Sequence, residues 1–140
     1  MAESKQIAMY RAVCEDGIGK GDLKVVDRFI APNMKEHETG VEPPNSEGLK
    51  NLIRMMHTAF PDLRVTVEDV WEMGDTVIGR ITWTGTHTGP LGDIPPTRKK
   101  VNVTGIDIVR FSGDKCVEHW GVTDRMSMME QLGVVQPMQA

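Results

Sequence analysis

Four titratable side chains stand on segments that the sequence predicts to be strands or strand ends: Asp107, His87, His119 and Asp124. Carboxyl and imidazole groups can transfer protons without a metal or a bound cofactor. They do so when partial burial in a pocket wall, which removes water from them, moves their pKa values toward the pH at which the protein works. The sequence therefore predicts proton-transfer chemistry with these four residues as the candidate catalytic groups.

Asp107 interrupts an otherwise apolar strand. A carboxylate at a core-facing strand position is costly unless it is paired or protonated. One interpretation is a pocket base with a raised pKa. The alternatives are a buried ion pair with Arg80 and a position on the solvent side of the sheet.

The histidines leave alternatives open as well. His87, near a strand end, could polarise a carbonyl group or shuttle a proton, but it could equally be a core histidine bonded to backbone groups. His119 alternates with Trp120, so only one of the two faces a pocket if the strand is regular. A bulge at Gly121 would change that.

Asp124 stands immediately before the expected closing helix, where Asp is among the best N-cap residues. The cap is therefore an alternative to a catalytic role. The two interpretations predict different activities for the Asp124→Ser variant. Ser also caps helices, so a cap alone predicts normal activity, whereas a catalytic role predicts a loss because Ser is not a carboxylic acid.

The length and composition predict one domain over residues 1–140, with enough chain for a hydrophobic core. The formal net charge of −4 argues against a nucleic-acid partner. Charged residues interrupt every apolar run, so neither a signal peptide nor a membrane span is expected. The two cysteines lack metal-ligand spacing and no nucleotide-binding motif is present, so we expect a reduced, cytoplasmic chain without metal or cofactor.

Hydrophobic periodicity predicts helices first and strands later. Ser4, Asp22 and Ser46 are suited to cap three helices, which end at the glycines after Ile18, before Pro32 and before Pro61. The period then changes to two, which predicts four strands and a closing helix: 63–68, 77–87, 101–111, 116–123 and 124–132. This order indicates an α+β domain in which a curved antiparallel sheet packs on the N-terminal helices.

Three motifs carry a resemblance to a known family: the segment 85–89 (GTHTG), the loop 94–97 (IPPT), and the ending with Glu118-His119-Trp120, Asp124 and 131–133 (QLG). Together, and over nearly the whole chain, they resemble the SnoaL-like polyketide cyclase family of the NTF2-like superfamily. The resemblance implies an α+β cone with one deep pocket, usually in dimers or tetramers. It also implies ring closure by an intramolecular aldol condensation without a cofactor.

The resemblance also places the family's functional positions on this chain. The family's acid/base aspartate falls on Gly121, and two polar partner positions fall on Gly105 and Asp107. His87 matches a family histidine. His37 falls where relatives often carry a histidine at the pocket mouth, and a surface histidine is the alternative.

We therefore expect a pocket that binds a hydrophobic, carbonyl-bearing small molecule, lined by six residues: Met56, Phe60, Trp83, His87, Asp107 and Trp120. Asp107 would be the base, and His87 would polarise the carbonyl group. Ile106 and Ile108 would face outward and be covered in a homodimer.

Two other functions stay open at this point. One is a non-catalytic ligand-binding protein on the same cone, which the absence of a carboxylate at Gly121 favours. The other is a hydratase or epoxide hydrolase relative, which would need an inward-facing Arg80 to hold a water.

Overall fold

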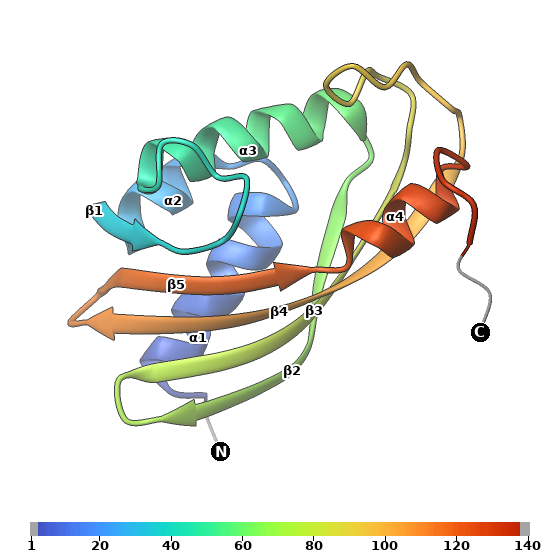
Figure 1. Ribbon diagram of the computed structural model, residues 1–140. Helices are drawn as coiled ribbons and strands as arrows, with labels where there is room; N and C mark the ends of the chain where they lie inside the picture. The colour runs from blue at the N-terminus through green and yellow to red at the C-terminus, as the bar shows by residue number, and fades with distance from the viewer. Residues whose placement is uncertain (1–2, 138–140) are drawn as a thin grey trace.

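The computed structural model describes residues 3–137, which form four α-helices, one π-helical segment and one five-stranded sheet (Figure 1). The helical segments are α1 (Lys5–Arg11), η1 (Ala12–Ile18), α2 (Leu23–Phe29), α3 (Ser46–Ala59) and α4 (Arg125–Gln131). The strands are β1 (Ile30–Glu36), β2 (Arg64–Met73), β3 (Thr76–Thr86), β4 (Lys100–Ser112) and β5 (Lys115–Thr123). The α+β class expected from the sequence is confirmed.

Side-chain caps fix where the helices begin. The Ser4 hydroxyl accepts a hydrogen bond from the Ile7 N–H, and the Asp22 carboxylate accepts one from the Lys24 N–H, as expected. Asn45, rather than the expected Ser46, caps α3, because its side-chain oxygen accepts from the backbone N–H groups of residues 47 and 48. Ser46 is instead the first residue of α3.

The sheet has the order β1-β5-β4-β3-β2, and β1 runs parallel to β5 while the other pairs are antiparallel. The sheet is therefore mixed, which corrects the expectation of an all-antiparallel sheet. The expected second helix ends at Phe29, and the following residues form β1. Pro32 is tolerated there because β1 is an edge strand and its pairing is irregular between Ile30 and Lys35.

The helices pack on the inner face of the curved sheet, and strand alternation decides which side chains face them. On β4, Val103 and Val109 are buried, whereas Ile106 and Ile108 are exposed on the outer face. Helix α1 lies close to the sheet at Gly79 of β3. A Cβ atom at Gly79 would overlap the hydroxyl of Tyr10, so only glycine fits there. This contact brings Tyr10 to the inner face beside Asp107.

Among residues 3–137, no helix is long and apolar enough to cross a membrane.

Candidate active site

A cavity of about 400 Å³ lies between the inner face of the sheet and the helices. Most of its wall is apolar, with side chains from η1, β1, α3, the sheet and α4: Val13, Met34, Leu49, Ile53, Val65, Trp83 and Met128. Its polar lining includes Tyr10, Glu36, Glu38, Asp107, His119, Thr123 and Arg125. A hydrophobic molecule would therefore meet a few polar groups at defined places in this wall.

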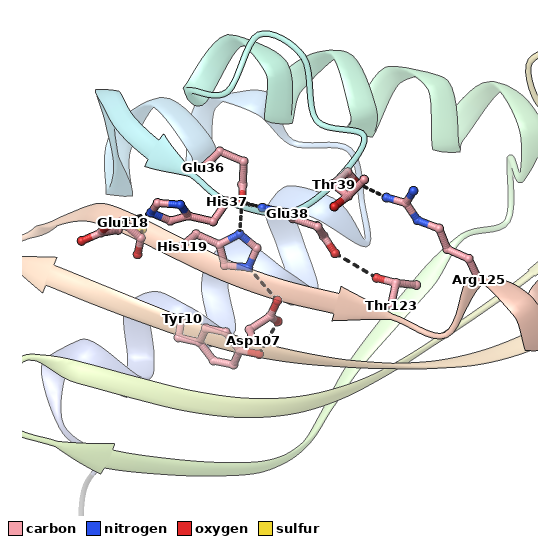
Figure 2. A network of polar contacts seen from close by, with 11 residues as sticks. Tyr10, Glu36, His37, Glu38, Thr39, Asp107, Glu118, His119, Thr123 and Arg125 are labelled. Atoms are coloured by element: carbon pink, nitrogen blue, oxygen red, sulfur yellow. Dashed lines mark hydrogen bonds and ion pairs between the residues drawn. The ribbon is translucent and has the colours of Figure 1, made fainter.

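Asp107 of β4 is held in the cavity wall by two hydrogen-bond donors. The Tyr10 hydroxyl donates to Oδ2 over 2.7 Å, and Nε2 of His119 lies 2.8 Å from Oδ1 (Figure 2). An ionised carboxylate can accept about four hydrogen bonds, so Asp107 keeps lone pairs for a further partner. Arg80 does not pair with Asp107, because it forms its ion pair with Asp69 over 2.7 Å.

His119 of β5 lies between two carboxylates. Its Nδ1 is 2.7 Å from Oε1 of Glu36, and its Nε2 is 2.8 Å from Asp107. Burial by itself would lower the pKa of His119, but the hydrogen bonds and charges of Asp107 and Glu36 together outweigh it and raise the pKa to about 10. His119 is therefore an imidazolium at neutral pH that donates from both ring nitrogens.

Gly121 leaves room for this arrangement. Gly121 pairs with Asp107 across β4 and β5. A Cβ atom at Gly121 would lie 2.7 Å from Cε1 and 2.9 Å from Nε2 of His119. The imidazole therefore occupies the space that a side chain at position 121 would need. The lack of a side chain at Gly121 is thus what lets His119 reach Asp107.

Comparison with known proteins identifies the family. The family model for the SnoaL-like polyketide cyclase matches residues 8–132. The chain belongs to the SnoaL-like polyketide cyclase family. Comparison with curated proteins gives no significant match.

Solved structures support the same assignment and show that the fold is NTF2-like. TsrD from Streptomyces laurentii is 26% identical, with a TM-score of 0.80 and coverage of 94% of each chain. Wild-type IdmH from Streptomyces antibioticus, a proposed polyketide cyclase, is 28% identical, with a TM-score of 0.82 over 93% of this chain and 99% of IdmH. A proposed polyketide cyclase from Acidithiobacillus ferrooxidans is 27% identical, with a TM-score of 0.80 over 96% and 99%.

The sequence did not point to several polar residues of this SnoaL-like site, among them Tyr10, Glu36 and Glu38. Tyr10 belongs to an apolar helical stripe, and nothing in the stripe signals that its hydroxyl reaches Asp107. Burial, with further contributions from Cys14 and Asp107, raises the pKa of Tyr10, so the phenol stays a proton donor. Glu36 lies on β1, the strand that the sequence did not predict, where it is paired in register with His119.

His87 lies outside the cavity wall, in contrast to the expectation that it lines the pocket. It follows β3 and is fully buried against Phe60, with the ring centroids 5.4 Å apart. Its Nδ1 accepts from the backbone N–H of Thr97 over 3.1 Å, so the ring ties the loop 94–97 to the end of β3. Within residues 3–137, its Nε2 is the one buried side-chain nitrogen or oxygen without a hydrogen-bond partner.

The expected ligand-binding residues separate into two groups. Met56 and Trp83 line the cavity. Phe60 is completely buried behind it and meets Trp83 edge-on at 5.3 Å, so it supports the wall without forming it. Trp120 is on the outer face, stacked on His37 at 4.9 Å, and neither of the two lines the cavity.

His37 and Asp124 each have a structural partner. Nε2 of His37 lies 2.8 Å from Oε2 of Glu118. The Asp124 carboxylate accepts from the Ser127 N–H over 3.0 Å as the N-cap of α4, and Asp124 is not part of the cavity wall. The cap interpretation of Asp124 is confirmed. Among residues 3–137, no group of three or more His, Cys, Asp and Glu side chains is arranged to hold a metal ion.

Proposed function

We propose that this SnoaL-like protein catalyses an intramolecular aldol-type cyclisation of a hydrophobic, carbonyl-bearing small molecule, by acid/base chemistry that needs no cofactor. The observation that carries the proposal is the position of the Asp107–His119 pair in the wall of a mostly apolar cavity of about 400 Å³. A desolvated cavity strengthens the interaction of a fixed charge with a developing one.

Asp107 is the proposed base. It removes a proton from the carbon next to a carbonyl group, and its remaining lone pairs are available for that proton. His119 and Tyr10 orient the carboxylate. The positive charge of His119 next to the reacting carbon favours the negative charge that develops on the enolate oxygen.

Proton exchange on a simple probe tests this role. The probe is a phenyl methyl diketone with three methylene groups between its carbonyl carbons, which closes to a phenyl cyclohexenone with loss of water. In D₂O, the wild-type protein should speed exchange of the protons next to the carbonyl groups. Asp107→Asn should lower that rate about 100- to 10,000-fold. Asp114→Asn, in the exposed turn after β4, is the matched control.

A second candidate function is a non-catalytic binding protein. It is favoured by the finding that both ring nitrogens of His119 and both oxygens of Asp107 already have partners within the protein. The same probe separates the two functions, because a binding protein holds the diketone and exchanges none of its protons at any pH.

Two further properties belong to this proposal. A homodimer would cover the outer-face side chains Ile106, Ile108, Trp120 and Val122, which are neighbours in the register of β4 and β5. The free thiols of Cys14 and Cys116 suit a reducing compartment, so we propose a cytoplasmic location.

A further inference from the structure

Glu38 lies in the cavity wall and has a different environment from the other two carboxyl groups there. It follows β1, is half-buried, and accepts a hydrogen bond from the Thr123 hydroxyl to Oε1 over 3.2 Å. Across residues 3–137, no other hydrogen bond or ion pair reaches its carboxyl group. Glu36 and Asp107, in contrast, both pair with His119.

The position of Glu38 is fixed from both sides along the chain. Its own backbone N–H donates to Oε1 of Glu36 over 2.9 Å. On the other side, the Arg125 guanidinium of α4 donates to the Thr39 carbonyl and packs over Gly40. The side chain points toward Thr123 (Figure 2) and lines the cavity.

The partial burial of Glu38 favours its protonated form. Burial raises the pKa of Glu38, and the negative charges of Asp107 and Glu36 add to this effect. The charge of His119 and the hydrogen bond from Thr123 act in the opposite direction but do not cancel it. One cavity thus holds Asp107, which accepts hydrogen bonds from Tyr10 and His119, and Glu38, whose carboxyl group has a raised pKa and no ion pair with any residue from 3 to 137. A carboxyl group of that kind can act as a proton donor.

We propose that Glu38 is the general acid of the cyclisation, an inference that rests on the proposed function. Asp107 takes a proton from the carbon next to one carbonyl group, which gives an enolate. The enolate carbon forms a bond to the second carbonyl carbon, whose C=O π pair moves onto oxygen. The Glu38 carboxyl group gives its proton to that oxygen. Glu38 regains a proton from solvent and Asp107 loses one, so the ring closure is an isomerisation with no co-reactant.

The diketone probe separates the acid from the base. Proton exchange in D₂O reports Asp107 alone. Ring closure to the cyclic hydroxy ketone, the isomer that precedes loss of water, also needs protonation of the new oxygen and is followed as loss of the open-chain diketone. Glu38→Gln keeps an oxygen for Thr123 and a hydrogen-bond donor, but it cannot release a proton. It should slow ring closure about 100- to 10,000-fold, whereas exchange, which needs only the Asp107 base, should change far less. Glu42→Gln, in the same loop and exposed, is the matched control.

Thr123→Val provides a second variant. It removes the hydrogen bond that lowers the pKa of Glu38, so the loss of ring closure at high pH should shift to higher pH. A carbon-13 NMR titration of the Glu38 carboxyl group should show a raised pKa in the wild type and a further rise in Thr123→Val.

The outcomes distinguish the two proposals. Normal ring closure by folded Glu38→Gln, or a Glu38 carboxyl group that titrates at the ordinary value of a glutamate, overturns the role of Glu38. In that case the exchange catalysed by Asp107 still supports the proposed function. Absence of exchange by the wild type at every pH overturns the proposed function, and the role of Glu38 with it.

Discussion

Nε2 of His119 lies 2.8 Å from Oδ1 of Asp107, and the imidazole ring covers the backbone of Gly121. The ring therefore fills the place of the side chain that position 121 lacks. The resemblance to the cyclases assigned their acid to this same position. In this chain, titratable groups from β4 and β5 meet there instead, and the cavity wall gains a carboxylate–imidazolium pair.

Gly121→Ala should break this pair. The new methyl group would lie within 3 Å of two ring atoms of His119, so the ring must move away from Asp107. We expect the free energy of unfolding to fall by about 1–3 kcal/mol, as for other overpacked sites. Urea unfolding measures the loss, and NMR of the imidazole protons should show a lower His119 pKa.

Gly105→Ala is the control for that experiment. Its Cβ atom would lie 3.3 Å from Cγ1 of Ile81, a flexible side chain that can move slightly. We expect a smaller loss of stability and an unchanged His119 pKa. An unchanged His119 titration in Gly121→Ala itself would show that the ring does not depend on the missing side chain.

His119 should also make stability depend on pH. Its pKa is about 10 in the folded protein and 6.5 for the free side chain, so the folded state holds the proton more tightly. This stabilisation is complete below pH 6.5 and is lost as the pH rises through 10. Between these values the free energy of unfolding should fall by about 1.4 kcal/mol per pH unit.

The measurement compares urea unfolding of the wild type and of His119→Gln across this pH range. Other groups titrate in both proteins, so the difference between the two isolates His119. A difference that stays flat from pH 6.5 to 10 would falsify the imidazolium assignment.

Strand alternation is sufficient to predict part of this site. The period of two along β4 puts Asp107 on the inner face, where the structure has it. Along β5 it requires His119 and Trp120 to face opposite sides but does not say which one faces inward. The expectation that Trp120 lines the pocket is wrong, because His119 takes the inner face. The same reasoning places His87 on the buried face. It does not reveal that the His87 ring bonds to Thr97 of the following loop and lies outside the cavity.

The remaining site residues depend on pairing between distant segments, which local patterns do not encode. Glu36 meets His119 only because β1 lies parallel to β5. Hydrophobic periodicity did not predict β1, because Pro32 interrupts the strand pattern. Tyr10 meets Asp107 only because Gly79 lets α1 approach the sheet closely. Glu38 enters the cavity through the loop that Arg125 holds in place.

Asp124 should prove replaceable by serine. Its carboxylate accepts from the Ser127 N–H at the start of α4, and a serine hydroxyl can do the same. We expect Asp124→Ser to keep wild-type stability and Asp124→Ala to lose about 1 kcal/mol, as measured by urea unfolding. Proton exchange on the diketone probe should be normal in both. A folded Asp124→Ser protein without exchange activity would give Asp124 a catalytic role after all.

The proposed dimer depends on exposed apolar side chains of β4 and β5. Ile106 is 51% exposed and Val122 is 75% exposed, and the two residues are paired across the strands. Light scattering should give twice the chain mass for the wild type and the single-chain mass for the Ile106→Lys/Val122→Lys double variant, because two buried ammonium groups oppose association. Thr66→Lys, an exposed position on β2 outside the apolar group, should stay dimeric. The two substituted residues face away from the cavity, so the monomeric variant should still exchange protons of the diketone probe. A wild-type protein that is monomeric at high concentration would rule out the dimer.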